Sequence, residues 1–329
     1  MTVTTSSTNS LKEILTTGRY FRRKFGESVY KIPVSITGFT CPNIDGRVSK
    51  GGCSFCENHS FSPNLGVAEI PKKFRLSWDS CENPFLQQQL EQMDFQVQKT
   101  RNKLKNKFKA HKFIVYFQSF TNTYAPLETL KVLYEKALSY EGVVGISIGT
   151  RSDAINDEIL DYLEELAKKY EVWIEYGIQT KYDETLKRIN RGHDFTSIVE
   201  AIKKTKERGI LVCGHLIFGL PGETQEMMIE SVKTSIDLGI DSIKIHPLYI
   251  TKKTVLANEF LNGKFEPIGE EDYIQTLIES LRIIPSNVMV QRVTAGIDSE
   301  SLLAPSWCKD LQRQKKKIYL ALKEAGFDY

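Results

Sequence analysis

The amino-acid sequence predicts an α/β fold in which strands and helices alternate around a parallel sheet. Two observations carry this prediction: apolar, β-branched runs recur along the chain, and stretches with helical spacing separate them. Right-handed crossovers between such strands give a parallel sheet. The pattern allows an open, doubly wound sheet or a sheet curled into a barrel, and in both the ligands bind at the carboxyl ends of the strands.

Six strands follow from the apolar runs. They lie at residues 32–39, 112–117, 143–149, 172–178, 210–219 and 241–250. Helical spacing predicts a helix after each strand. These helices lie at residues 84–108, 126–140, 156–170, 195–208, 223–238 and 269–283.

The two ends of the chain depart from this alternation. Residues 11–31 are a basic, aromatic lead-in, and a strand-like run at 287–293 and a basic helix from about residue 309 follow the last βα unit. We therefore expect three regions. They are an N-terminal basic arm at residues 1–32, a core at residues 33–250 and a C-terminal α/β extension at residues 251–329.

The composition indicates a protein of a reducing compartment. The chain has 329 residues, and none of its runs approaches the roughly 18 apolar residues that cross a membrane. Its start, MTVTTSSTNS, has no signal-peptide pattern. The six cysteines form a clustered trio and three single residues, unlike the disulfide framework of a small secreted domain. These observations predict a soluble, cytoplasmic protein with no membrane partner.

Three thiols stand directly after the first predicted strand. Cys41, Cys53 and Cys56 occupy the glycine-containing segment CPNIDGRVSKGGCSFC. A structural zinc ion needs four ligands, and His59 could supply the fourth. A [4Fe-4S] cluster held by three cysteines instead keeps one iron open for a ligand from outside the protein. The residues by themselves leave both metal sites open.

At this loop the sequence resembles the radical SAM superfamily, in which three cysteines after the first barrel strand bind a [4Fe-4S] cluster. The resemblance implies a partial (β/α)6 barrel, and S-adenosyl-L-methionine (SAM) bound to the open iron through its amino and carboxylate groups. The gap between Cys41 and Cys53 is wider than the commonest spacing of the superfamily and is similar to that of its Elp3-like branch. A reductase, flavodoxin or ferredoxin is the implied electron donor.

Two further segments resemble parts of the SAM site of the family. QSFTNT (118–123) stands where relatives hold the SAM amino group, and its Asn122 could accept a hydrogen bond from an ammonium. SIGTRSD (147–153) is similar to a motif of the Elp3-like branch and has Thr150 near the position of a SAM-contacting carboxylate in other branches. Arg151 could bind the methionine carboxylate. Alternatively, it closes an ion pair with Asp153.

The later strands complete the implied site. In the family, the Gln of a GxQ segment contacts the SAM ribose and the Arg of an NRG segment contacts its carboxylate, which here are Gln179 and Arg191. His215 stands where porphyrin-type relatives have a ribose-binding Asp, or it is a core histidine with satisfied hydrogen bonds. His246 and Tyr249 end the sixth strand, where adenine or substrate could stack.

The remaining cysteines have no partner in spacing. Cys81 and Cys213 are predicted to be structural. Cys308 is either a packed loop residue or a redox-active thiol that donates a hydrogen atom. No residue is predicted as a catalytic acid or base.

Nearly the full chain resembles the YhcC/YtqA (MnmL-like) group of radical SAM proteins, through the strings RYFRRKFGESVYKIPVSITGFTCPN, EYGIQT and INRGH. That resemblance implies an enzyme that converts 5-carboxymethylaminomethyl-(2-thio)uridine at the tRNA wobble position to 5-aminomethyl-(2-thio)uridine through a 5′-deoxyadenosyl radical. The implied partners are tRNA and a tRNA methyltransferase that acts afterwards.

Basic segments at residues 19–24 and 99–112 predict contacts with tRNA phosphates, or form a solvated lysine face. Two other functions remain open at this stage. One is a radical SAM enzyme that acts on a small molecule such as a porphyrin precursor. The other is a zinc-binding nucleic-acid adaptor that uses the same three cysteines.

Overall fold

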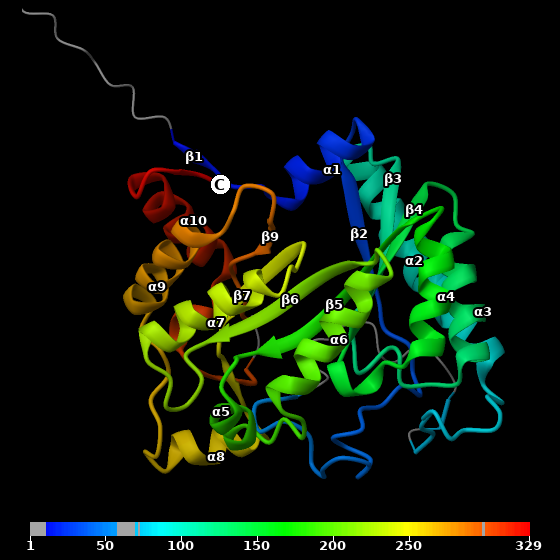
Figure 1. Ribbon diagram of the computed structural model, residues 1–329, viewed down its shortest axis with the longest axis horizontal. Coiled ribbons are helices and arrows are strands. Elements are labelled where there is room, and N and C mark those ends of the chain that lie inside the picture. Colours follow the sequence, from blue (N-terminus) through cyan, green and yellow to red (C-terminus); the bar gives the residue numbers. More distant parts are fainter. Residues whose placement is uncertain (1–10, 58–69, 72, 298–299) are drawn as a thin grey trace, which may run out of the picture.

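The computed structural model describes residues 11–57, 70–71, 73–297 and 300–329. Its centre is a seven-stranded parallel sheet in the order β2-β3-β4-β5-β6-β7-β9 (Figure 1). The strands are β2 (Val29–Val34), β3 (Lys112–Phe117), β4 (Val143–Thr150), β5 (Glu171–Gln179), β6 (Leu211–Phe218), β7 (Ser242–Pro247) and β9 (Met289–Arg292).

The sheet is curled rather than open. Lys31 on the edge strand β2 donates a hydrogen bond of 2.6 Å to Gln291 on the opposite edge strand β9. This bond joins the two ends of a seven-stranded row, so the sheet encloses a lumen. The predicted partial barrel is therefore confirmed, and the open doubly wound sheet is excluded.

The described residues form ten α-helices, most of which cover the outer face of the sheet. They are α1 (Thr17–Phe25), α2 (Leu86–Phe108), α3 (Leu127–Leu138), α4 (Asp157–Ala167), α5 (Asp183–Arg188), α6 (Phe195–Glu207), α7 (Gln225–Asp237), α8 (Val255–Leu261), α9 (Glu270–Ile283) and α10 (Leu311–Glu324). Side-chain caps fix several starts, since Asn156, Asp194 and Thr224 each accept a backbone N–H three residues ahead. The six predicted helices between the strands and after β7 are all present.

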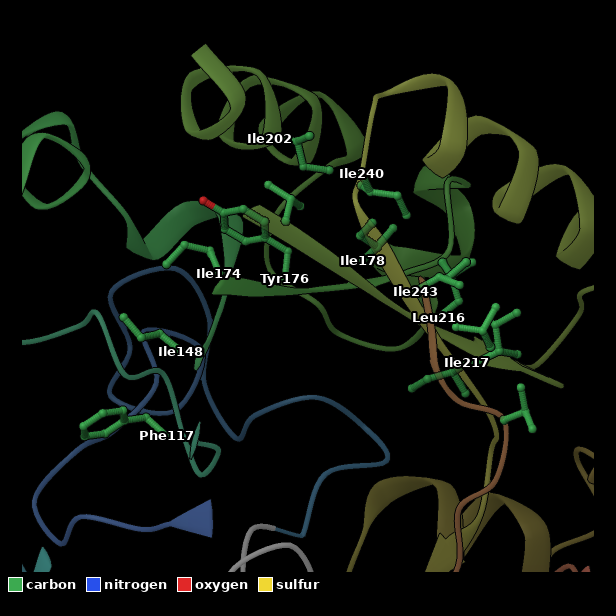
Figure 2. Close-up of a cluster of buried hydrophobic side chains, with 14 of the residues drawn as sticks. Phe117, Ile148, Ile174, Tyr176, Ile178, Ile202, Leu216, Ile217, Ile240 and Ile243 are labelled. Atoms are coloured by element: carbon green, nitrogen blue, oxygen red, sulfur yellow. The ribbon is translucent and has the colours of Figure 1, made fainter. Parts of the chain in front are cut away.

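The apolar core lies between the sheet and these helices. Ile174, Tyr176 and Ile178 on β5, with neighbouring strand residues, form a cluster against Ile202 of α6 (Figure 2). Each of these side chains is almost fully buried. Apolar residues of alternate strand positions thus face the helices, which leaves the other positions for the lumen.

The first strand differs from its prediction. It covers 29–34 rather than 32–39. Beyond Val34 the backbone N–H groups of Ser35 and Thr37 donate to the side chains of Gln96 and Gln92, at 2.8 Å each. Side chains of α2 thus replace a strand partner, and the freed segment becomes the loop that carries Cys41.

The lead-in does not project as an arm but closes the amino end of the barrel. β1 (Lys12–Glu13) pairs with β11 (Phe327–Asp328), and the N–H of Val290 donates to the carbonyl of Leu15 at 2.8 Å. α1 lies at the top of Figure 1, and the blue loop that follows β2 lies at the bottom. The buried ring of Phe21 explains the packing, which the high charge of the segment obscures in the sequence.

The predicted extension adds to the core rather than standing apart. β9 joins the central sheet, and β8 (Ile250–Thr251) pairs with β10 (Leu302–Ala304). Short 3-10 turns lie at Ser152–Ala154 and Ser306–Cys308. Within the described ranges, no helix combines the length and the apolar character needed to cross a membrane.

Candidate functional site

The cysteine loop is held by the loop that follows α5. Asn43 donates one hydrogen bond of 2.6 Å to the carbonyl of Asn190 and a weaker one, at 3.5 Å, to the Sγ of Cys53. Asn190 in turn donates to the carbonyl of Gly52 at 2.7 Å and accepts from Ser49 at 2.9 Å. The two loops therefore form one unit at the carboxyl end of the sheet.

The three thiols share one electrostatic environment. Burial raises the pKa of the Cys56 thiol, and the neighbouring sulfurs of Cys53 and Cys41 raise it further. A cation placed among these sulfurs would reverse this effect, because it stabilises the thiolate.

Three thiols alone do not complete a zinc site. A structural zinc ion needs four ligands, whereas a [4Fe-4S] cluster held by three cysteines keeps one iron open for a ligand from outside the protein. His59, the fourth zinc ligand of the alternative, lies outside the described residues.

Two guanidinium groups lie beside the cysteine loop. Arg151 binds Asp153 through two hydrogen bonds, of 2.8 and 2.7 Å, and donates to the carbonyl of Arg191 at 2.7 Å. Arg191 donates to the carbonyl of Gly177 at 2.7 Å, and its Nη1 lies 3.6 Å from the Sγ of Cys53. Both residues are buried, and Asp153 balances the charge of Arg151, whereas Arg191 pairs with no carboxylate of the described residues.

A glycine allows two of the predicted residues to meet. A Cβ added at Gly177 would lie 2.6 Å from the Nε2 of Gln179 and 2.8 Å from the Nη2 of Arg191. Gln179 has a φ of 70°, at a bulge where the register of β5 against β6 shifts. The bulge and the missing side chain at Gly177 together bring the amide of Gln179 beside the guanidinium of Arg191.

Polar atoms without a partner collect around this loop. Among the described residues, eleven buried side-chain N and O atoms have no hydrogen-bond partner. Five of them lie on the cysteine loop and next to it: Thr40 Oγ1, Asn43 Oδ1, Ser54 Oγ, Arg151 Nη1 and Arg191 Nε. Buried polar groups are normally satisfied, so this concentration indicates that a polar ligand completes the site. Two free N–H groups on guanidinium ions fit a carboxylate in particular.

A buried charge network forms the floor. The carboxylate of Glu175 accepts hydrogen bonds from Lys31 at 2.7 Å, Ser147 at 2.6 Å and His215 at 2.7 Å, and it also pairs with Lys244. Burial opposes the charge of Glu175, but Lys244 and Lys31 outweigh it and hold its pKa well below the ordinary value. Its ligand-like neighbour Cys213 is therefore no sign of a metal site, because two ammonium groups already occupy this carboxylate.

Above this floor the lumen is one cavity of about 540 Å³. It runs from the cysteine loop, past Thr150, Arg151, Gln179 and His215, to the extension. The far part of its wall is formed by His246, Tyr249, Arg292 and Lys315.

The structure thus brings five of the six predicted SAM contacts to one cavity, namely Thr150, Arg151, Gln179, Arg191 and His215. Asn122 is not among the lining residues, because its amide is turned inward and donates to the carbonyl of Gly149 at 2.9 Å. Cys308 is buried in the extension beside Gln314 and does not line the cavity, and Cys81 is exposed.

Sequence reasoning missed the charges inside the barrel. Lys31, Glu175 and Lys244 each stand within a strand at a position that faces the lumen, and Arg292 and Lys315 come from the extension. The available signal was a charged residue in the middle of an otherwise apolar strand, as in EVWIEYGIQ and SIKIHP. Such a charge is costly to bury unless a partner exists, so it predicts an internal ion pair.

Comparison with known proteins finds two family models that match this chain. The family model described as the Radical SAM superfamily matches residues 44–234, and that described as the Radical SAM C-terminal domain matches residues 240–324. The chain is 37% identical to the protein YtqA of Bacillus subtilis over 91% of this chain and 86% of YtqA. It is 36% identical to the protein YhcC of Escherichia coli over 88% of this chain and 85% of YhcC.

More distant likeness extends to the Elp3-like proteins. A tRNA uridine(34) acetyltransferase of Methanocaldococcus infernus is 30% identical over 47% of this chain and 29% of that protein. The solved structure of the archaeal Methanocaldococcus infernus Elp3 matches with a TM-score of 0.61 at 19% identity, over 92% of this chain and 65% of that chain, which shows a common fold.

Proposed function

The chain belongs to the radical SAM superfamily, and we propose that it is a tRNA-modifying member, converting 5-carboxymethylaminomethyl-(2-thio)uridine at the wobble position to 5-aminomethyl-(2-thio)uridine. The observation that carries the proposal is the cavity, which joins the cysteine loop to a wall of basic side chains. This substrate has a base, which can bind at the mouth of the barrel, and a carboxylate, which can bind to the basic side chains of that wall.

Enzymes of this superfamily use a [4Fe-4S] cluster and SAM. We assign the cluster to Cys41, Cys53 and Cys56, which share one electrostatic environment and lie beside buried guanidinium nitrogens that have no partner. When bound, the two cofactors supply a 5′-deoxyadenosyl radical. The protein then has three tasks, which are to hold SAM, to orient the substrate C–H bond and to exclude water.

For SAM we assign the carboxylate to Arg191 and Arg151, because each retains a buried nitrogen without a partner beside the cysteine loop. Gln179 is assigned to the ribose, and Thr150 and His215 complete the wall around it. Asn122 keeps a supporting role in this proposal, since its bond to Gly149 fixes the loop after β4.

Two observations support tRNA as the substrate. One relative carries the name tRNA uridine(34) acetyltransferase, and its likeness covers nearly half of this chain. The cavity volume of about 540 Å³ is in the range of sites that enclose a small organic ligand. A nucleotide that leaves its stack can enter a pocket of this kind.

The basic segments that were predicted to contact phosphates lie at the amino end of the barrel, away from the cysteine loop. Lys112 donates to the carbonyl of Phe25 at 3.1 Å and pairs with Glu27, and Lys105 pairs with Glu141. Lys24 pairs with the buried Glu171. We therefore assign these cations mainly to the fold, and we expect the phosphates next to the bound nucleotide to meet exposed cations near the cysteine loop.

The proposal includes partners that follow from the chemistry. A flavodoxin, ferredoxin or reductase would supply electrons to the cluster, and a tRNA methyltransferase would act on the amine that the reaction releases. We also propose a cytoplasmic location, where cysteines without disulfide partners stay reduced.

Mass spectrometry of bulk tRNA nucleosides from a strain that lacks the gene tests the proposal. The strain is expected to accumulate carboxymethylaminomethyl-uridine and to lose the aminomethyl and methylaminomethyl forms. The wild-type gene should restore them, and a gene with Cys53→Ala should not. A nucleoside profile identical to that of the parent, in an organism without a second route, would refute the tRNA assignment and direct the search to a small-molecule substrate.

A further inference from the structure

A row of nitrogen-bearing side chains crosses β6, β7 and β9 on one wall of the lumen. His215 on β6 pairs in register with Lys244 on β7, and Lys244 pairs with Arg292 on β9. Side chains of in-register neighbours in a parallel sheet point to the same face. Since His215 points into the lumen toward Glu175, Lys244 and Arg292 face the lumen as well.

The charges on this wall are not balanced. Lys244 and Lys31 both pair with Glu175. Among the residues that the structure describes, Glu175 is the one carboxylate that lines the cavity, so this carboxylate is already shared between two cations. Arg292 and Lys315 also line the cavity, and no carboxylate of the described residues pairs with either of them. Arg292 is exposed, at the end of the edge strand β9.

The neighbours of Arg292 respond to its charge. Burial, followed by the positive charge of Arg292, lowers the pKa of His246 well below its ordinary value. The imidazole of His246 is therefore neutral at pH 7, and it offers a hydrogen bond without adding charge. An anionic group at this wall would have one planar guanidinium, one ammonium and one neutral imidazole around it.

We propose that Arg292, assisted by Lys315, binds the carboxylate of the substrate and thereby determines the specificity of the enzyme for a carboxymethylated base. This inference rests on the proposed function and names the recognition element of that substrate. The planar fork of an arginine matches a carboxylate in a bidentate arrangement. Arg151 and Arg191 serve the carboxylate of SAM at the other end, so each carboxylate has its own guanidinium.

Length and position agree with this assignment. Arg292 is the last residue of β9, and it pairs with Lys244, which stands two residues before His246 on β7. A base held at the mouth would project its substituent toward Arg292, and the atoms between the base and the carboxylate would pass in front of the cofactor end of the cavity. In the proposed reaction, SAM would serve as the oxidant that removes a hydrogen atom and an electron from the carbon that carries the carboxylate. Addition of water would then break the bond between this carbon and the nitrogen, releasing glyoxylate and the aminomethyl base.

The test compares two anticodon stem-loops that differ at one group. One carries the wobble base with the free carboxymethylaminomethyl acid, and the other carries its methyl ester. Their binding to protein loaded with cluster and SAM is measured under anaerobic conditions. The phosphates are identical, so a difference in affinity reports the carboxylate alone. We expect the wild-type protein to prefer the acid by about tenfold or more.

Arg292→Gln should remove the preference for the acid, because it weakens binding of the acid stem-loop and leaves binding of the ester stem-loop unchanged. Arg292→Lys should keep part of the preference. Lys315→Gln should reduce the preference less than Arg292→Gln does. Arg313→Gln is the matched control, because Arg313 pairs with Glu270 on the same extension and does not line the cavity. Iron content and SAM binding show that each variant is folded. Equal weakening of both stem-loops would show that Arg292 meets a phosphate, and it would overturn the inference.

The outcome also separates this inference from the proposed reaction. A preference that depends on Arg292, without conversion to the aminomethyl base, supports the carboxylate site and refutes the reaction. Conversion by the wild-type protein, with a preference that Arg292→Gln leaves unchanged, refutes the site and keeps the reaction. If the wild-type protein binds the acid and the ester stem-loops with equal affinity, the carboxylate site is refuted.

Discussion

The Nε2 of His215 lies 2.7 Å from the Oε2 of Glu175, on the floor of the cavity. Burial and then the charge of Lys244 lower the pKa of His215 to about 4, although Glu175 acts in the opposite direction. His215 is therefore a neutral imidazole at pH 7 with one nitrogen committed to Glu175. It is both a core histidine with a satisfied bond and a residue of the cavity wall, which the sequence had presented as alternatives.

The stability of the barrel should depend on Glu175. Glu175→Ala would leave the buried ammonium of Lys244 without its counter-ion, and breaking such a buried pair costs about 3–5 kcal/mol. We expect urea denaturation to show a decrease of that size in the free energy of unfolding. Glu279→Ala is the control, because its partner Arg282 is exposed, and it should change stability by about 0.5 kcal/mol or less. A loss below about 1 kcal/mol for Glu175→Ala would contradict this account.

The same histidine predicts how stability changes with pH. The folded pKa of His215 is about 4, and its ordinary value is 6.5. Between these values the unfolded chain binds a proton that the folded chain does not, so stability falls as the pH decreases from about 6.5 to 4. The loss should be smaller in His215→Asn, and parallel curves for the two proteins would refute the assignment. Denaturation midpoints at intervals across this range provide the measurement.

Much of this architecture was predictable, and what was not has a physical reason. The periodicity of apolar residues predicted the strands β3 to β7 and the helices between them, because each strand buries one face against helices. The end of β2 was misplaced, because Gln92 and Gln96 satisfy the backbone that a strand would have used. The role of α1 was hidden, because its cations pair with distant Glu171 and Asp328.

The residues of the site also divide into those that the sequence predicted and those that it did not. Motif spacing identified the cysteines and Gln179, but no spacing relates Arg292 to the cavity. Arg292 reaches the lumen only because β9 adds to the sheet beside β7, which is a long-range pairing. For Arg151, the sequence offered an ion pair or a ligand contact, and the structure contains the pair with Asp153 and also leaves Nη1 without a partner.

Gly177 should be essential for SAM binding although it offers no side chain. An alanine there would press its Cβ against Gln179 and Arg191, so Gly177→Ala should weaken SAM affinity and leave the iron content intact. Gln179→Ala and Arg191→Ala should each cost about 1.5–3 kcal/mol of SAM binding, with Arg191→Ala the worse. Gly18→Ala is the control, since an added Cβ at Gly18 meets nothing within 4 Å. Unchanged SAM affinity in all three site variants would show that SAM binds elsewhere.

The metal content should depend on only three of the six cysteines. Anaerobically reconstituted protein is expected to bind about four irons per chain, with a reduced-state EPR signal that changes on addition of SAM. Cys41→Ala, Cys53→Ala and Cys56→Ala should each abolish SAM cleavage. Cys213→Ala and Cys308→Ala should retain the iron, because both side chains are buried outside the cysteine loop. Stoichiometric zinc without iron uptake would overturn the cluster assignment.

The position of the cations predicts which of them tRNA binding uses. Lys50 on the cysteine loop and Lys187 on α5 are exposed at the carboxyl end of the sheet, whereas Lys103 and Lys107 are exposed on the part of α2 that leads to the start of β3. Each phosphate contact contributes somewhat under one unit to the slope of log affinity against log salt.

A double variant Lys50→Gln and Lys187→Gln should therefore reduce that slope by somewhat under two units, and Lys103→Gln with Lys107→Gln should leave it nearly unchanged. Filter binding of tRNA between low and moderate salt gives both slopes, while iron content and SAM cleavage without tRNA should equal those of the wild type in both variants. If the Lys103→Gln and Lys107→Gln variant reduced the slope of log affinity against log salt instead, the tRNA would approach from the amino end of the barrel. A nucleotide bound there could not reach a cavity that opens beside the cysteines, so that result would count against the wobble base as the substrate as well as against the docking side.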